Sequence, residues 1–374
     1  MIQELYLIFD GVENTVFYSQ IYQQIKQKVE RKELFNPVII SFEKDPLQAT
    51  YFYNANFADL KTTNVFIWQR MPLLGKWTLH LAAHRLKNFL AKNPTQKVIC
   101  RGEAAAYILL KSIEFFIADQ EVKKKIDLDE TSIKNLCNEI EILIPGLASF
   151  EVLLKKKEQG IALLKSKIKM WFLFNLCTAI EQVVFSVNNF WRLSSKLKVT
   201  YVFASKALKD YAIQHFELLP YICTVSEVVI DPIDWDKKME ARVIVRTKHG
   251  IDLDANIYCY SGGMQPWQSF DLCIEAFLEF AKKDEKAFFL VLTHHAPEAQ
   301  ELITQFKVPA HQYLILKLKP ELLHTYHLAC DFGMIFREAN IVNWTSRPIK
   351  VIEYKQAGLL VLHNFTIEWV IQSC

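Results

Sequence analysis

The chain has 374 residues, of which 51% are hydrophobic and 23% charged, so it can form two ordinary hydrophobic cores and is too apolar to be mainly disordered. Its 44 lysines and arginines nearly balance 41 aspartates and glutamates, and the net charge of +3 gives no indication of a nucleic-acid-binding footprint. We therefore expect a two-domain globular protein.

The start of the chain and the cysteines indicate a reducing compartment. The segment "MIQELYLIFD" carries Glu4 and Asp10 and lacks the basic flank and length of a secretory signal. The eight cysteines form no CxxC pair, which favours reduced, buried thiols. The most apolar stretch, 170–180, is shorter than the about 20 residues needed to span a bilayer. The sequence thus predicts a cytoplasmic protein.

Short apolar runs in the first half predict strands at 5–9, 37–42, 64–68, 97–100, 124–128 and 200–205. A long basic and aromatic stretch, 149–197, predicts helical structure. One interpretation is a solvated helix that packs its apolar face on its own domain. The other is docking of 155–172 on the anionic inner face of the membrane, where each basic residue adds about 1 kcal/mol.

The second half alternates strands and helices from residue 255 onward. Strands are predicted at 256–263, 287–293, 313–318, 332–336 and 359–362, with helices at 269–283, 297–306, 320–329 and 347–357. Continuous apolar strands separated by helices indicate a parallel sheet covered on both faces, whose ligands bind at the carboxyl ends of the strands. We expect two doubly wound, Rossmann-like α/β domains, 1–230 and 231–374, that face each other across a cleft.

The segment "RPIKVIEYKQAGLLVL", 347–362, has the composition of a helix that follows a loop and precedes a strand. Ser346 is a suitable N-cap, and Pro348 fits the first turn because its missing N–H costs nothing there. Gly358 fits the left-handed position after the last turn. These residues predict a helix over 347–357.

The charged residues of this segment suit a nucleotide. A helix N-terminus attracts phosphate, and Arg337 and Lys350 add positive charge beside it. Glu353 lies one turn further along nearly the same face as Lys350, where a carboxylate can accept hydrogen bonds from two ribose hydroxyls. The alternative is a surface ion pair between Lys350 and Glu353.

These motifs resemble those of a known family. The pattern "PxKxxEYxxxGLxVL" is similar to the donor-site helix of family-4 glycosyltransferases, retaining enzymes with the glycosyltransferase-B fold. "CDFGMIFRE" (330–338), "YSGGMQPWQSFDLCIEAF" (260–277) and "VFASKALKDY" (202–211) resemble further family segments in the same order, of the type that acts in surface-polysaccharide assembly. The resemblance covers 200–362 and is weak over the first 150 residues.

The resemblance implies a nucleotide diphosphate-sugar bound by the second domain, a glycan or lipid-linked glycan acceptor bound by the first, and transfer with retention. No metal or cofactor is expected, and no nucleic-acid partner. Glu353 occupies the position of the family's ribose-binding glutamate, whereas Thr345 stands where the family has a sugar-contacting glutamate. Gly263 and Gln268 stand where many relatives have diphosphate-binding cations, a role for which Arg337 and Lys350 can substitute.

Candidate site residues follow from these positions. The candidate donor-binding residues are Gly262, Gly263, Gln268, His294, Arg337, Thr345, Lys350 and Glu353. In the first domain, Gly11 is a candidate acceptor-binding residue, and Arg101 and Asp127 are candidate catalytic residues. His80 and His84 have metal-ligand spacing but lack the glutamate that metalloprotease chemistry requires, so no metal site is predicted.

Two alternatives remain open at this point. A catalytically silent relative, acting as a scaffold or partner-binding subunit, is compatible with the departures at Gly263, Gln268 and Thr345. A sugar-nucleotide epimerase on the same fold would bind the donor without an acceptor. The chain also ends soon after the strand 359–362, where relatives continue, so a shortened second domain is expected.

Overall fold

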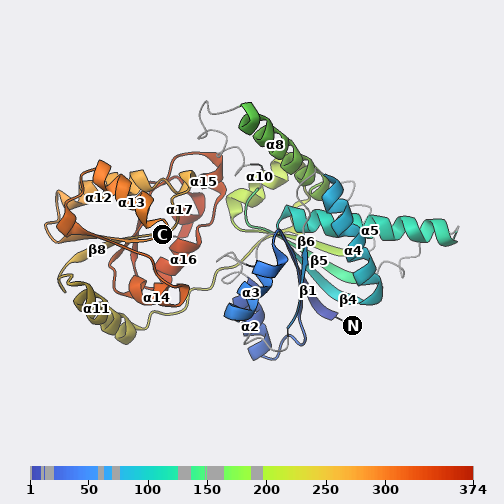
Figure 1. The fold of residues 1–374 in the computed structure, drawn as a ribbon, viewed down its shortest axis with the longest axis horizontal. Coiled ribbons are helices and arrows are strands. Elements are labelled where there is room, and N and C mark those ends of the chain that lie inside the picture. Colours follow the sequence, from blue (N-terminus) through green and yellow to red (C-terminus); the bar gives the residue numbers. More distant parts are fainter. Residues whose placement is uncertain are drawn as a thin grey trace. The chain divides into compact units, whose positions relative to one another are not determined.

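The computed structural model describes residues 2–9, 12, 21–57, 63–69, 76–124, 136–147, 149, 164–186 and 197–373. They form two compact units, of which the first ends at Ser226 and the second begins at Glu227. Each unit is a parallel sheet with helices packed against it (Figure 1). Gly11 and Asp127 lie outside the described residues, so their assignments stay predictions.

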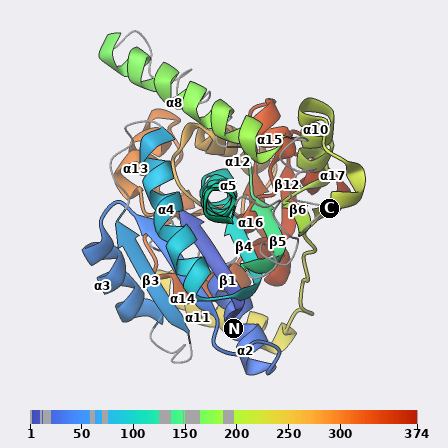
Figure 2. The ribbon, with the colours of Figure 1, turned by 90° about the vertical axis from the view of Figure 1, so that its right-hand side faces the viewer.

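The first unit contains a seven-stranded parallel sheet in the order β3-β2-β1-β4-β5-β6-β7. Its strands are β1 (Ile2–Phe9), β2 (Val38–Glu43), β3 (Asn64–Gln69), β4 (Thr95–Arg101), β5 (Cys137–Ile144), β6 (Lys198–Phe203) and β7 (Cys223–Val225). Its helices are α2 (Gln23–Glu30), α3 (Pro46–Phe57), α4 (Lys76–Lys92), α5 (Glu103–Lys124), α8 (Leu164–Val184) and α10 (Lys206–Phe216). Figure 2 shows α5 end-on beside α4, over the strands of this sheet.

Strands β1, β2, β3, β4 and β6 confirm the predictions at 5–9, 37–42, 64–68, 97–100 and 200–205. The strand predicted at 124–128 is wrong at its first residue, because Lys124 is the last residue of α5, and the rest lies outside the described residues. The strand that instead joins β4 and β6 is β5, which the sequence analysis missed.

Strand β5 carries two glutamates whose partners are on other strands. Glu141 Oε2 lies 2.6 Å from Lys97 Nζ, and Glu139 Oε1 lies 3.2 Å from Lys198 Nζ. Lys97 belongs to β4 and Lys198 to β6, so both ion pairs form only when the sheet is assembled. Ile140 and Ile142, which alternate with the glutamates, are buried, as a half-buried strand requires.

The C-terminal half of α8 packs on its own unit. Leu176, Ile180 and Val184 are buried, and buried Glu181 accepts a hydrogen bond from the backbone N–H of Ser149 at 2.9 Å. Among the helices that the structure describes, none is both long and apolar enough to cross a membrane. Residues 155–163 lie outside the described residues, and docking of 155–172 on a membrane surface stays a prediction.

The second unit contains a five-stranded parallel sheet in the order β10-β9-β8-β11-β12. Its strands are β8 (Asn256–Ser261), β9 (Ala287–Leu292), β10 (Tyr313–Leu316), β11 (Phe332–Ile335) and β12 (Leu360–His363). Its helices are α11 (Trp235–His249), α12 (Phe270–Ala281), α13 (Ala296–Gln305), α14 (Pro320–Leu328), α15 (Ile341–Thr345), α16 (Ile349–Gln356) and α17 (Glu368–Ser373). The predicted strands of this half are all confirmed.

Both faces of the second sheet are covered, as continuous apolar strands require. Along β8, Ile257 and Cys259 belong to the core shared with α11, α14 and α16, whereas Tyr258 and Tyr260 belong to the core shared with α12 and α13. Figure 1 shows α12 and α13 on one side of β8 and α11 and α14 on the other. The unit is therefore doubly wound, which directs ligands to the carboxyl edge of its strands.

Helix α11, which the sequence analysis did not predict, is anchored by buried cations. Arg246 has no exposed surface, and its guanidinium donates to the carbonyls of Leu253 (2.9 Å) and Ala255 (2.6 Å) and to Asp331 Oδ2 (2.8 Å). Lys238 Nζ donates to the carbonyl of Ala357 at 2.7 Å. These bonds attach α11 to the segments that precede β8, β11 and β12.

Candidate functional site

The chain order of the second sheet reverses at β8. Strands β9 and β10 lie on one side of β8, and β11 and β12 lie on the other. At such a switch point, a ligand binds outside the carboxyl ends of the two diverging strands. Strand β8 is followed by Gly262 and Gly263, and β11 is followed by Arg337, so the topology places the predicted donor residues at one edge.

Gly262 provides room for the end of Lys350. Its φ of +154° lies in the region that favours glycine, and a Cβ there would lie 2.7 Å from Lys350 Nζ. The turn is stabilised by Tyr260, whose hydroxyl donates a hydrogen bond to the carbonyl of Gly263 at 2.6 Å. Glycine at 262 therefore leaves space for a side chain of this protein, in addition to the ligand approach expected from the sequence.

Lys350 is a buried cation in the first turns of α16. It is 9% exposed, and its ammonium lies 4.2 Å from the centroid of the Tyr260 ring, a cation–π contact. Among the described residues it forms no ion pair with a carboxylate. Burial, and next the charge of Arg337, lower the pKa of Lys350 to about 7. A bound anion would stabilise its charged form.

Arg337 is the second buried cation at this edge, with 5% of its surface exposed. Its Nη2 donates to Gln268 Oε1 at 3.0 Å, and its Nη1 donates to Asn343 Oδ1 at 3.3 Å. Its Nε is buried without a partner among the described residues. Burial lowers the pKa of this guanidinium. The structure thus brings together Gln268, Arg337 and Lys350, as the sequence analysis proposed.

Glu353 lies one turn after Lys350 on α16 and is partly buried. Burial raises the pKa of its carboxyl group, and the charge of Lys350 opposes this rise. Among the described residues, no hydrogen bond or ion pair involves the carboxylate of Glu353, so the surface ion pair with Lys350 that was weighed from the sequence is not formed. Its carboxylate remains available to accept hydrogen bonds.

Tyr354, which the sequence analysis did not assign, attaches α16 to the sheet. It is fully buried, and its hydroxyl accepts a hydrogen bond from the backbone N–H of Ser261 at 2.9 Å. Its ring lies on Gly333 of β11, where a Cβ would come within 2.3 Å of ring carbon Cδ2. A lone glycine in an apolar strand is the sequence feature that indicates such a close approach.

Gly333→Ala is therefore expected to destabilise the protein by about 1–3 kcal/mol, because the added methyl group displaces the Tyr354 ring. Equilibrium urea unfolding measures this loss. Gly146→Ala is the matched control, since a Cβ at Gly146 would meet nothing within 4 Å. Equal stability of the two variants would contradict the packing role of Gly333.

The entry to α16 differs from the sequence prediction. The helix runs over Ile349–Gln356, and the N-cap position is Pro348, with no side-chain capping bond. The prediction of Ser346 as N-cap is wrong: Ser346 closes the preceding helix α15, and its hydroxyl donates to the carbonyl of Asn343 at 2.8 Å. Gly358 does adopt the predicted left-handed conformation, with φ of +66°.

Two other predicted donor residues, Thr345 and His294, follow from position in the sheet. Thr345 is 3% exposed, and its hydroxyl donates to the carbonyl of Ile341 at 2.8 Å within α15. His294 follows β9 and is exposed. The predicted roles of both residues in donor binding rest on position alone.

The first unit has a corresponding edge. Strand β1 lies between β2 and β4, so the chain order reverses there. Strand β4 ends at Arg101, which is partly buried, and Gly102 follows with φ of +79° and donates its N–H to the carbonyl of Leu143 at 2.9 Å. Arg101 therefore lies where a ligand of this unit is expected, beside the end of the strand that precedes Gly11.

The histidines with metal-ligand spacing have structural surroundings. His80 Nε2 lies 3.1 Å from the hydroxyl of Tyr107, and the ring of His84 stacks on Phe115 at a centroid distance of 4.0 Å. Over the described ranges, no group of three or more His, Cys, Asp or Glu residues has a geometry that could hold a metal ion.

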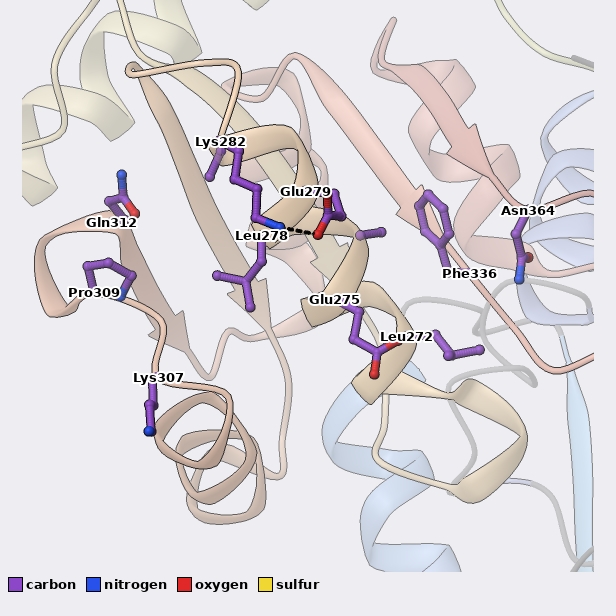
Figure 3. A pocket seen from close by; sticks show the side chains of 12 residues that line it. Leu272, Glu275, Leu278, Glu279, Lys282, Lys307, Pro309, Gln312, Phe336 and Asn364 are labelled. Carbon is purple, nitrogen blue, oxygen red and sulfur yellow. Dashed lines mark hydrogen bonds and ion pairs between the residues drawn. The ribbon is translucent and has the colours of Figure 1, made fainter.

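An open groove of about 750 Å³ runs along the outer side of α12 (Figure 3). Figure 3 shows Glu275 and Leu278 of α12 and Lys282 just after it on one wall, with Lys307 and Pro309 opposite and Phe336 and Asn364 at the other end. Its lining includes neither Lys350 nor Arg337. The groove is therefore distinct from the site that contains these two buried cations.

No protein-family model matches the sequence, and the search of curated proteins found no match. Solved structures do match over nearly the whole chain. A glycosyltransferase from Rickettsia africae has 13% identity and a TM-score of 0.59, covering 97% of this chain and 79% of its own. Anabaena Alr3699/HepE in complex with UDP has 11% identity and a TM-score of 0.61, with coverages of 99% and 82%.

WaaG, a glycosyltransferase involved in lipopolysaccharide biosynthesis, has 13% identity and a TM-score of 0.59, covering 98% of this chain and 83% of its own. Together with the two parallel sheets, these similarities show the fold: two Rossmann-like α/β domains of the glycosyltransferase-B type. The fold class predicted from the sequence is confirmed.

Proposed function

We propose that this chain is a glycosyltransferase that takes a sugar from a nucleoside diphosphate-sugar. The observation that carries the proposal is the pair of buried cations, Lys350 and Arg337, at the switch point of the second sheet without a carboxylate partner among the described residues. A diphosphate supplies the missing negative charge, and it bridges two cations well. The fold shared with glycosyltransferases, and with Anabaena Alr3699/HepE solved in complex with UDP, supports the same function.

The remaining details follow from the sequence motifs. Glu353 binds the donor ribose, and the acceptor, a glycan or lipid-linked glycan of surface-polysaccharide type, binds at the edge of the first unit near Arg101. Transfer occurs with retention. The acceptor hydroxyl oxygen bonds to the anomeric carbon on the face from which the diphosphate departs, the bond to the diphosphate oxygen breaks, and a diphosphate oxygen takes the hydroxyl proton.

In this mechanism, Lys350 and Arg337 act on the leaving group. The departing nucleoside diphosphate gains negative charge in the transition state, and fixed positive groups there stabilise it by several kcal/mol. No resident metal ion or cofactor is required by this scheme. We further propose a cytoplasmic location, with 155–172 as the segment that contacts an anionic membrane surface.

The experiment that tests the proposal is a thermal-shift series with UDP, GDP, ADP, CDP and TDP. A ligand at about 100 times its dissociation constant stabilises the native state by roughly 2.7 kcal/mol, which is a visible shift. A rise in melting temperature with one nucleotide identifies the base of the donor. The corresponding nucleotide sugars are then assayed for transfer to glycan acceptors. A cooperative transition that no nucleotide moves would contradict the proposal and favour a catalytically silent relative.

That alternative has one observation in its favour. The hydroxyl of Thr345 is engaged inside α15 and is nearly buried, so this position offers no evident contact to a donor sugar. An epimerase would differ from a transferase by converting the nucleotide sugar without any acceptor. Product analysis with and without a glycan acceptor separates these two activities.

Glu353→Ala is expected to weaken nucleoside diphosphate binding about tenfold or more, because charged hydrogen bonds contribute about 1.5–3 kcal/mol. Inorganic pyrophosphate, which has no ribose, should bind both proteins equally. Isothermal titration of both ligands provides the comparison. If Glu353→Ala binds the nucleotide as tightly as the wild type does, the ribose assignment is wrong.

A further inference from the structure

The guanidinium of Arg337 is held by two amide side chains. A guanidinium only donates hydrogen bonds, so the atoms that face it must be the amide oxygens of Gln268 and Asn343. The orientation of Asn343 is fixed independently, because its Nδ2 donates to the carbonyl of Glu338 at 2.9 Å. Asn343 is fully buried on α15 and was not predicted from the sequence.

These acceptors are neutral, which distinguishes Arg337 from Arg246, the other deeply buried arginine among the described residues. Arg246 has Asp331 Oδ2 at 2.8 Å, so its charge is compensated within the protein. Among the described residues, the guanidinium of Arg337 donates only to amide oxygens, and its Nε has no partner. Arg337 also lies close enough to Lys350 to lower the pKa of the lysine. Two buried like charges without compensation destabilise the fold unless an anion joins them.

We propose that Gln268 and Asn343 are positioning residues that orient Arg337 without neutralising it, so that its charge is compensated by the diphosphate of a bound nucleotide. This inference rests on the proposed function and adds to it the reason for an amide at position 268. A carboxylate there would make the same bond to Arg337 and would remove the charge that the ligand needs.

Gln268→Glu tests the proposal because glutamate has the shape of glutamine and adds one negative charge. Without ligand, the variant should melt at a higher temperature than the wild type, since the buried cations gain a partner. Its dissociation constant for the nucleoside diphosphate that the wild type binds should rise about tenfold or more. Gln305→Glu, at an exposed position of α13, is the matched control and should change neither value.

The outcomes separate this inference from the proposed function. Failure of the wild type to bind any nucleoside diphosphate contradicts the proposed function. Wild-type binding that Gln268→Glu fully retains overturns the positioning role alone. If Gln268→Glu melts no higher than Gln305→Glu in the absence of ligand, the cations are not uncompensated, and the inference is wrong whether or not a nucleotide binds. Gln268→Asn, which keeps a neutral amide, should retain more affinity than Gln268→Glu.

Discussion

Lys350→Met is expected to lower the affinity for the nucleoside diphosphate by roughly a hundredfold, because losing one partner of a buried charged contact costs about 3 kcal/mol. Methionine fills the space of the aliphatic part of lysine without its charge. Isothermal titration measures the loss. Lys283→Met, at an exposed position just after α12, is the control and should bind as the wild type does. Unchanged binding by Lys350→Met would remove the central support for the proposed function.

The same variant has a characteristic pH dependence of stability. The pKa of Lys350 in the folded protein is lowered to about 7 from 10.5. Between these values the unfolded state binds more protons than the folded state does, so the contribution of Lys350 to stability rises with pH in this window. Below pH 7 both states are protonated, and the buried charge destabilises the fold fully.

Lys350→Met should accordingly be more stable than the wild type at pH 6.5, and this gain should shrink as the pH rises toward 10. Melting temperatures across this range provide the test. A bound diphosphate restores the charged form of Lys350, so wild-type binding takes up a proton above pH 7 and weakens as the pH rises. A gain that stays constant with pH would contradict the burial of a charged Lys350.

Arg246→Met is expected to destabilise the second unit by about 3–5 kcal/mol, because it leaves several buried carbonyls without donors and removes one of the two guanidinium partners of Asp331. Equilibrium urea unfolding measures the change. Arg242→Met is the matched control, since Arg242 pairs with the same Asp331 but is partly exposed, and it should cost much less. If both variants lose the same stability, the carbonyl contacts of Arg246 contribute nothing.

The sequence predicted the second unit well because its strands are continuous apolar runs separated by helices. Each run can be recognised by itself, and the topology of a parallel sheet then places the ends of β8 and β11 together. The helix that follows β11 points to Arg337, Lys350 and Glu353, whereas Gly262 and Gln268 are expected at this edge from the family resemblance.

The features that the sequence analysis missed depend on distant partners. Strand β5 contains Glu139 and Glu141, which read as polar interruptions until Lys97 and Lys198 on neighbouring strands are placed beside them. Helix α11 shows no clear apolar face in the sequence. One of its buried positions is occupied by Arg246, which is bonded to carbonyls from other segments. A local sequence pattern does not indicate contacts with residues that are distant in the chain.

The capping error has a local cause. Ser346 precedes Pro348 by two residues, a spacing that suits a helix N-cap, but Ser346 is already the C-cap of the short helix α15 immediately before it. The same short helix supplies Asn343 to Arg337. A five-residue helix has too few residues for a periodic pattern, so neither its existence nor its role could be read from the sequence.

The hydroxyl of Tyr354 is the acceptor for the backbone N–H of Ser261, the last residue of β8. That amide can exchange its hydrogen with solvent only when Tyr354 withdraws, which requires α16 to separate from the sheet. Exchange at Ser261 thus reports how often the helix that carries Lys350 and Glu353 detaches. A ligand that binds through this helix slows exchange at an amide that it does not itself need to touch.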